Sequence, residues 1–324
     1  MPWSSGSVRR ARLALTAALA AAVVGTGPLA AGDRAFVTCQ NGDALSVIDL
    51  GTGEEVARWD VPGKPAGVAV ASDGSVYTVS PDSKTVRHLS PDGALLAETT
   101  LDGGPIGIVL DEARGRVFVS DWYNARIWEL TAVDLSTLSQ LATGEAPAGL
   151  SLSPNGRFLA SADKDADQVS IFDADTLEIA HRVKVGTRPF GLRFAPDGRL
   201  FVGNVGSNDV TVLDPASGEI LATVPVGERP YGVAFAQGRA FVTNQYANTV
   251  SVIALDDLST VATLDVGEYP EGIDTTPDGA HVVVANWFEN TVEVIDAQSL
   301  EIVDAIETAD GPRAFGRFIT GGTE

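Results

Sequence analysis

The feature that most constrains the fold is a tripeptide, Pro-x-Gly, that returns at nearly constant spacing along the chain. Successive prolines of this motif are 40, 42, 42, 41, 40 and 42 residues apart. Such spacing indicates a single structural unit copied seven times. The copies begin at Pro65, Pro105, Pro147, Pro189, Pro230 and Pro270, and a stretched last copy runs from Pro312 to Gly316.

Each unit contains four short stretches typical of β-strands. The first follows Pro-x-Gly, as in residues 232–235, and a turn such as Pro196-Asp-Gly198 leads into the second. The third alternates apolar and polar residues, as in 250–254, so we expect one of its sides to be buried against a neighbouring sheet. The fourth resembles residues 302–306. No helical periodicity interrupts this series after the first thirty residues.

A period of this length with four strands per unit is typical of a β-propeller blade. The sequence therefore predicts an all-β protein, a seven-bladed β-propeller of four-stranded antiparallel blades, in one domain over residues 32–324. The chain enters the repeat at a second strand (34–38) and leaves it after a first strand (314–319). We expect the C-terminal strand to complete the N-terminal blade, which removes an exposed sheet edge.

The first 31 residues have a different character. Arg9, Arg10 and Arg12 precede an apolar stretch over residues 13–24, and small residues follow as far as Ala31. This order predicts a secretory signal peptide over residues 1–31, cleaved near Ala31, and a periplasmic protein. The apolar stretch is shorter than the roughly 20 residues of a membrane span, so no membrane insertion after cleavage is expected. The export route stays open between the general secretory and twin-arginine pathways.

Charge and motifs limit the function classes. A formal net charge of -21 argues against nucleic acid as a partner. Cys39 is the single cysteine, so no internal disulfide can form, and we expect a packed thiol. His88, His181 and His281 fall at non-equivalent places in the repeat, so no shared metal site is expected. Residues 163–167 resemble the start of a calcium loop but lack its glycine and its closing glutamate. We predict no metal, no cofactor and no catalytic residue.

One face of the predicted ring differs from the other. The loops from strand four to strand one and from strand two to strand three should emerge on the same face, and large polar and aromatic residues gather there along one arc. Two interpretations stay open: these residues bind a partner, or they cover the ends of the blades. The arginines either bind an anionic group or pair with Glu271. The candidate ligand or partner residues are Lys64, Arg188, Phe190, Arg229, Tyr231, Tyr246, Tyr269, Glu271, Trp287 and Arg313.

The repeat also resembles a known family. Phe241-Val-Thr-Asn244, residues 248–253, and Val266-Gly267 before Pro270 resemble the YVTN β-propeller repeat of surface-layer and periplasmic YncE-like proteins. This resemblance covers essentially the whole chain after the leader. It implies an exported seven-bladed propeller without agreed catalytic residues. Some relatives accompany quinoprotein or cytochrome-linked oxidation systems, so a partner role beside such a system is a further expectation.

The sequence therefore favours a non-catalytic, monomeric binding or accessory module whose partner is a periplasmic protein or a small ligand. The alternative is a lactonase-like hydrolase or lyase with its site at the mouth of the central channel. In that case Glu271 is the loop residue suited to act as acid or base. A redox accessory that holds a quinone or haem without covalent bonds stays open as a third hypothesis.

Overall fold

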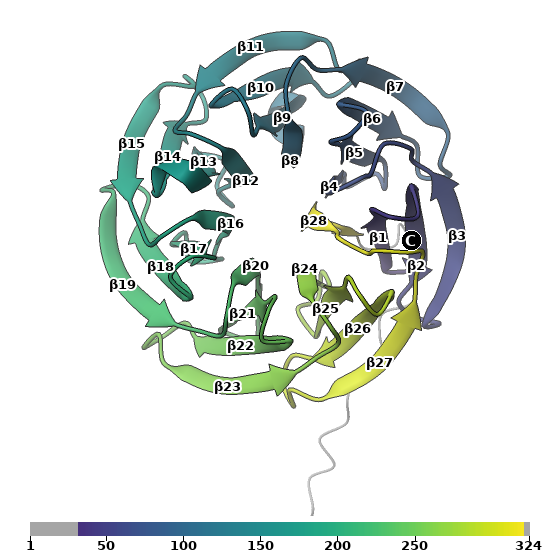
Figure 1. Cartoon of the computed structure of the whole chain (residues 1–324), viewed down its shortest axis with the longest axis vertical. Coiled ribbons are helices and arrows are strands. Elements are labelled where there is room, and N and C mark those ends of the chain that lie inside the picture. Colours follow the sequence, from purple (N-terminus) through teal and green to yellow (C-terminus); the bar gives the residue numbers. More distant parts are fainter. Residues whose placement is uncertain (1–31, 321–324) are drawn as a thin grey trace, which may run out of the picture.

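The computed structural model describes residues 32–320, which form a ring of seven sheets (Figure 1). The predicted seven-bladed, all-β architecture is confirmed. The predicted signal peptide lies outside the described residues. Besides strands, the ring contains the short 3-10 turns η1 (Glu112–Arg114) and η2 (Lys164–Ala166). Within residues 32–320 there is no helix of the length and hydrophobicity needed to cross a membrane.

Four concentric rows of strands make up the ring, from the axis to the rim. The innermost strands are β4 (Gly67–Val70), β8 (Pro105–Asp111), β12 (Pro147–Leu152), β16 (Pro189–Phe194), β20 (Pro230–Ala236), β24 (Pro270–Thr275) and β29 (Ile319–Thr320). The second row is β1 (Arg34–Cys39), β5 (Val76–Ser80), β9 (Arg116–Asp121), β13 (Phe158–Asp163), β17 (Leu200–Asn204), β21 (Arg239–Asn244) and β25 (His281–Asn286).

The outer two rows complete each blade. The third row is β2 (Ala44–Asp49), β6 (Thr85–Leu89), β10 (Arg126–Thr131), β14 (Gln168–Asp173), β18 (Asp209–Asp214), β22 (Thr249–Ala254) and β26 (Thr291–Asp296). The rim is β3 (Glu54–Asp60), β7 (Leu95–Thr100), β11 (Thr137–Ala142), β15 (Ile179–Lys184), β19 (Glu219–Pro225), β23 (Thr260–Asp265) and β27 (Ile302–Glu307). Blades are numbered below from one, which contains β1, to seven, which contains β24.

The hydrophobic cores lie between blades. Phe241 and Val250 of blade six pack with Ile273, Val284 and Ile295 of blade seven in one cluster. Since each blade is covered on both faces, its third strand is buried on both sides, as in β2. The expectation of one buried side for that strand is wrong. The regular alternation of exposed and half-buried residues falls on the rim strands, as in β3.

The polar residues of the buried third strands bond to the ends of the second strands. Ser170 donates to Asp163 Oδ2 at 2.6 Å, and Asn244 donates to Ser251 Oγ at 2.9 Å. These contacts satisfy polar groups that would otherwise be costly to bury. They explain why small polar residues recur at both places in the repeat.

The ring is closed by the C-terminal segment, as expected. Strand β29 pairs antiparallel with β1, so that Ala35 lies opposite Ile319. The expected strand over 314–319 is divided, however: β28 (Phe315–Arg317) pairs in parallel with β4 of blade two. Figure 1 shows β28 near the axis, inward of β1 and beside β4, with β27 of the last blade next to β3 of the first.

The glycine of Pro-x-Gly is needed because the innermost strands approach each other closely. A Cβ atom added at Gly191 would lie 1.8 Å from the Tyr231 carbonyl oxygen of the next blade. At Gly107 it would lie 2.2 Å from the carbonyl oxygen of Ala148. The same tripeptide thus allows tight packing around the axis and aims its central residue toward the neighbouring blades.

Candidate functional site

The two predicted loop sets do share a face, and backbone hydrogen bonds join them. Gln245 N–H donates to the Arg229 carbonyl at 3.0 Å, and Trp287 N–H donates to the Tyr269 carbonyl at 3.1 Å. Arg229 and Tyr269 have left-handed backbone conformations, with φ of 60° and 62°. Ala146 adopts the same conformation, with φ of 53°, in a part of the face without large side chains. This backbone strain therefore belongs to the repeat and does not mark a functional residue.

An aromatic cluster fills the axis at this face. The Phe190 ring lies 4.5 Å from the Tyr231 ring and 5.2 Å from the Phe315 ring, measured between centroids. Trp122 of blade three reaches Phe190 of blade five at 5.9 Å. Since these rings come from separate blades, the opening between the ribbons in Figure 1 is occupied by side chains at this level.

Buried polar groups surround Tyr231. Arg313 Nη2 donates to the Tyr231 hydroxyl at 2.8 Å, and Arg313 Nε lies 3.1 Å from Glu271 Oε2. Gln245 Nε2 donates to Glu271 Oε1 at 2.5 Å. Of the two alternatives for the arginines, the structure thus shows pairing with Glu271 for Arg313.

The environment of Glu271 combines burial with a neighbouring cation. Burial raises the pKa of its carboxyl, and Arg313 opposes this shift. Burial likewise raises the pKa of Tyr231. A raised carboxyl pKa suits a general acid, but Glu271 is only 5% exposed and both of its oxygens face protein groups. As arranged, Glu271 holds the axial cluster together and does not face an open site.

A second group of side chains lies farther from the axis, over blades six and seven. The Arg229 guanidinium lies 4.7 Å from the centre of the Tyr246 ring and donates to the Tyr246 hydroxyl at 3.0 Å. The Tyr269 ring contacts Tyr246, Trp287 and Phe288 at centroid distances of 5.6, 5.8 and 4.9 Å. We call Arg229, Tyr246, Tyr269, Trp287 and Phe288 the aromatic rim.

A shallow pocket of about 420 Å³ opens on the aromatic rim. It is lined by Glu228, Gln245, Tyr246, Asn248, Glu268, Tyr269 and Phe288. Tyr246 and Phe288 remain 50% and 59% exposed beside it.

The ten candidate residues thus fall into separate places. Phe190, Tyr231, Glu271 and Arg313 meet at the axis, whereas Arg229, Tyr246, Tyr269 and Trp287 meet at the aromatic rim. Lys64 and Arg188 join neither group. Lys64 Nζ donates to the Asn41 carbonyl at 3.4 Å, and Arg188 is exposed, with its backbone N–H bound to Asp167 Oδ1.

Four residues that line this pocket were not among the candidates expected from the sequence: Glu228, Glu268, Gln245 and Phe288. A signal was present for the two glutamates, because Gly-Glu-x-Pro occurs at both 227–230 and 267–270. Gln245 directly follows the last residue of β21, where a side chain passes from the core to the loop face.

Two of the residues considered for metal or redox chemistry are buried inside the protein. Cys39 is fully buried, and burial raises the pKa of its thiol. Asp163 is also fully buried and accepts hydrogen bonds from Gly144, Ser161, Gln168 and Ser170. Over residues 32–320, no three His, Cys, Asp or Glu side chains are grouped so that they could hold a metal ion.

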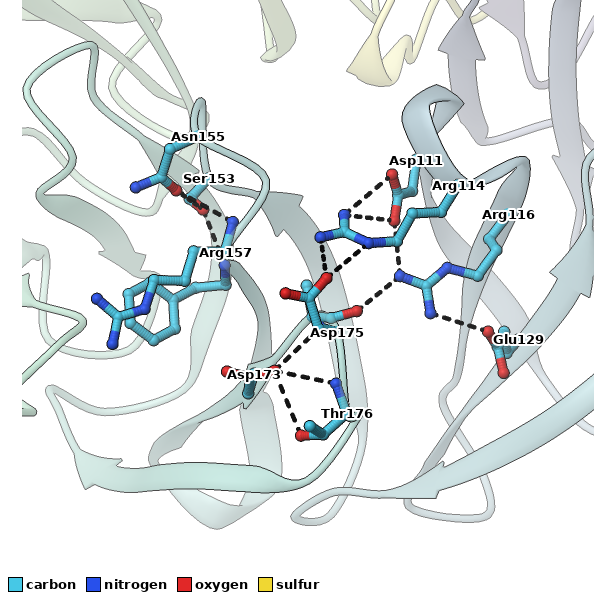
Figure 2. Close-up of polar contacts among 12 residues, drawn as sticks. Asp111, Arg114, Arg116, Glu129, Ser153, Asn155, Arg157, Asp173, Asp175 and Thr176 are labelled. Atoms are coloured by element: carbon cyan, nitrogen blue, oxygen red, sulfur yellow. Dashed lines mark hydrogen bonds and ion pairs between the residues drawn. The ribbon is translucent and has the colours of Figure 1, made fainter.

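The opposite face carries an ion-pair network (Figure 2). Arg116 bridges Asp111 at 2.8 Å and Glu129 at 3.1 Å, and Arg114 binds Asp111 and Asp175. Arg116 also donates to the Ala174 carbonyl at 2.6 Å, which ties blade three to blade four. Each carboxylate of this network has an arginine partner within the protein.

Comparison with known proteins identifies the family. The sequence profile of the family described as "Lactonase, 7-bladed beta-propeller" matches residues 35–235, which is more than half of the chain. The chain belongs to this family. The match ends near blade six, so most of the aromatic rim lies beyond the part that resembles the lactonase family profile.

Curated relatives of this lactonase-family chain are distant. Antigen Lp49 of Leptospira interrogans is 24% identical over 197 residues, covering 52% of this chain and 42% of that protein. NHL repeat-containing protein 2 of Bos taurus is 26% identical over 157 residues, covering 36% of this chain and 22% of that protein. The chain spans less than half the length of these relatives.

Solved structures share the fold of this lactonase-family chain at low identity. A functionally unknown protein from Desulfotomaculum acetoxidans gives a TM-score of 0.76 at 17% identity, covering 90% of this chain and 99% of that one. A streptogramin B lyase gives a TM-score of 0.68 at 20% identity, covering 80% of this chain and 92% of that one. A chain of Kuenenia stuttgartiensis hydrazine synthase gives a TM-score of 0.65 at 15% identity, covering 78% of this chain and 89% of that one. These likenesses concern the fold alone.

Proposed function

We propose that this chain is an exported, non-catalytic binding module of the YVTN-repeat type that uses the aromatic rim to hold a periplasmic protein or a small ligand. One observation carries the proposal. The charged groups at the axis are buried and pair with each other, whereas the aromatic rim exposes large rings beside a pocket. Exposed aromatic clusters of this kind are typical of interaction surfaces.

The position of the rim supports this function. Loops on a rigid scaffold are where binding residues most often lie. Here the loops of blades six and seven are tied together by backbone bonds, so the rings are held in place before a partner arrives. Service beside a quinoprotein or cytochrome-linked oxidation system is part of the same proposal and rests on the resemblance to YncE-like proteins.

The test is photo-crosslinking in the periplasm of the host. A photoreactive phenylalanine analogue is placed at Phe288, and the matched control carries it at Tyr123, the equivalent loop position of blade three, which is 76% exposed. We expect a discrete adduct at position 288 that disappears when Tyr246 and Tyr269 are replaced by alanine. Equal adducts at both positions, or none at 288, would contradict a binding role for the rim.

Hydrolase or lyase activity on a lactone is a second candidate, favoured by membership of the lactonase family. Glu271 would be the acid or base, and its raised carboxyl pKa fits that role. A substrate would have to displace the contacts of Arg313 or Gln245 to reach it. Turnover of a panel of lactones by the purified protein tests this candidate, and turnover that is equal in Glu271→Gln would exclude Glu271 as the catalyst.

A further inference from the structure

The charged residues that line the pocket on the aromatic rim are all acidic. They are Glu228 and Glu268, and no Lys or Arg lines the pocket. Asn248 Oδ1 is already engaged, because it accepts the Tyr269 N–H at 3.0 Å. The charged lining of the pocket therefore consists of hydrogen-bond acceptors alone.

The two glutamates stand on equivalent, well-anchored turns. Each is the second residue of a Gly-Glu-x-Pro sequence, in the loops that lead into β20 and β24. The Glu228 carbonyl accepts the Tyr246 N–H at 3.2 Å, and the Glu268 carbonyl accepts the Phe288 N–H at 3.3 Å. The backbone of each glutamate is thus held next to an exposed aromatic residue of the neighbouring loop.

Gln245 supplies an independent observation. It lines the pocket but is only 2% exposed, so it lies beneath the exposed rim residues. Its Nε2 donates to Glu271 Oε1 at 2.5 Å. Its Oε1 has no hydrogen-bond partner among the described residues. A buried acceptor without a partner is unfavourable, and a donor from a ligand would remove this penalty.

The rings of the pocket suit the same kind of ligand. Tyr246, Tyr269 and Phe288 offer aromatic faces, which attract cations, and apolar ring surface, which covers aliphatic chains. Arg229 contacts the Tyr246 ring without lining the pocket, so the protein itself already places one guanidinium on this cluster. A volume of about 420 Å³ is in the range of small-ligand sites.

We propose that this pocket binds a primary ammonium or guanidinium group carried on a short aliphatic chain. Glu228 and Glu268 pair with the charge, Gln245 Oε1 accepts one of its N–H groups, and the rings cover the chain. This inference rests on the proposed binding function and names the chemistry that the aromatic rim recognises. Such a group is present both in free diamines and in the Lys or Arg side chains of a protein.

Titration of the full mature protein with agmatine and cadaverine tests the proposal, with Trp287 fluorescence and calorimetry as readouts. Neutral 1-pentanol serves as the comparison probe of similar length. The variants are Glu228→Gln and Glu268→Gln, alone and together. Glu145→Gln is the matched control, because Glu145 occupies the same position of Gly-Glu-x-Pro in blade four, away from the pocket.

We expect both amines to bind and 1-pentanol not to bind. Each glutamate variant should weaken amine binding about tenfold, because it removes a charged partner of the bound cation. Glu145→Gln should bind like the unaltered protein, and higher salt should weaken binding throughout. Absence of amine binding at millimolar concentration, or equal binding by Glu228→Gln, Glu268→Gln and Glu145→Gln, would overturn the proposal.

Two further comparisons are needed. One distinguishes a protein side chain from a free amine as the source of the cation, and the other distinguishes the cationic ligand class from the binding function itself. A short Arg- or Lys-containing peptide that binds more tightly than the free amine indicates a protein partner, and the reverse order indicates a small amine. If the amines fail to bind while the rim still gives its specific crosslink at position 288, the cationic ligand class is wrong and the binding function stands. If both fail, the binding function is wrong as well.

Discussion

At the scale of single residues, the ion pair between Arg313 and Glu271 shows how this protein handles buried charge. The two side chains come from different parts of the ring. Arg313 also donates to the Tyr231 hydroxyl, and Glu271 accepts from Gln245. A buried pair of this kind is weak evidence for stability by itself, but removal of one partner leaves a buried charge without compensation.

The first prediction follows from that asymmetry. Arg313→Met should lower the free energy of unfolding by about 3 kcal/mol, because Glu271 then remains buried without its cation. The double variant Arg313→Met with Glu271→Gln should recover part of the loss. Urea denaturation of both variants measures this, and a double variant less stable than Arg313→Met would show that the pair does not act as described.

His88 leads to a prediction about pH. Its ring stacks on Tyr77 at 4.2 Å, and burial lowers its pKa below the ordinary value of 6.5, although Val133 and Asp73 partly oppose the shift. Below pH 6.5 the unfolded chain takes up a proton more readily than the folded chain, so stability should fall as the pH drops below about 6.5. His88→Phe should remove this component.

Chemical denaturation at pH 7.5 and pH 5.5 provides the measurement for His88. The control is His181→Phe on the rim strand β15, which should keep the pH dependence because His88 is still present. An equal loss of stability at the lower pH in His88→Phe and His181→Phe would assign the effect to other groups.

Single residues are also where prediction from sequence was least complete. The packed environment of Cys39 and the non-equivalent places of the three histidines follow from the repeat, and the structure confirms them. The role of Gln245 could not be predicted, because it depends on a contact with Glu271, which is 26 residues away and in the next blade. The repeat aligns equivalent positions but does not state which of them touch.

At the scale of the secondary-structure elements, the repeat predicted nearly everything. The strands after Pro-x-Gly, the tight turns and the four-strand blade all appear as expected, since each depends on local pattern. The burial of the third strand was predicted wrongly, because in an isolated sheet its alternating polar residues would face solvent. In the ring they face the polar ends of the second strands, as Ser170 and Asp163 do.

The inner strands provide the prediction at this scale. Gly191→Ala should destabilise the protein by about 3 kcal/mol, because the added methyl group would collide with the Tyr231 carbonyl at the closest approach of two blades. Gly115→Ala is the control: it also changes a glycine, but nothing lies within 4 Å and only its left-handed φ of 62° is disfavoured, at about 1 kcal/mol. Similar melting temperatures for both variants would rule out close strand approach as the reason for this glycine.

At the scale of the whole molecule, Asp274 links three parts of the ring. Its Oδ1 lies 2.7 Å from Arg193 Nη1 of blade five, and its Oδ2 accepts the N–H groups of Phe318 and Ile319 at 2.8 and 3.1 Å. Arg193 also donates to the Gly316 carbonyl at 2.9 Å. The closing segment is thus held by buried charge as well as by strand pairing.

Asp274→Ala should therefore cost about 3–5 kcal/mol, since it leaves Arg193 without its carboxylate and frees two backbone N–H groups. Hydrogen exchange should accelerate first in β29 and β1. Asp197→Ala, which breaks an ion pair on the surface with Arg199, should change stability by less than about 1 kcal/mol. Unchanged protection of Ala35 and Phe36 in Asp274→Ala would show that strand pairing alone closes the ring.

The overall ring could be predicted because the offset between the two ends of the repeat requires closure. The division of the C-terminal segment into β28 and β29 could not, because it depends on the distance that the chain must cross from blade two to blade one. The aromatic cluster at the axis could not be predicted from the sequence either, since the central residues of Pro-x-Gly meet only when all blades are in place.

The closure of the ring affects how the chain folds during its synthesis on the ribosome. Blade one receives its innermost strand from residues 319–320, which leave the ribosome after every other strand of the ring. Until then β1 keeps a free edge, and unpaired edges promote wrong association during synthesis. The β1 edge is therefore the part of the nascent chain that is prone to wrong association until residues 319–320 have been made.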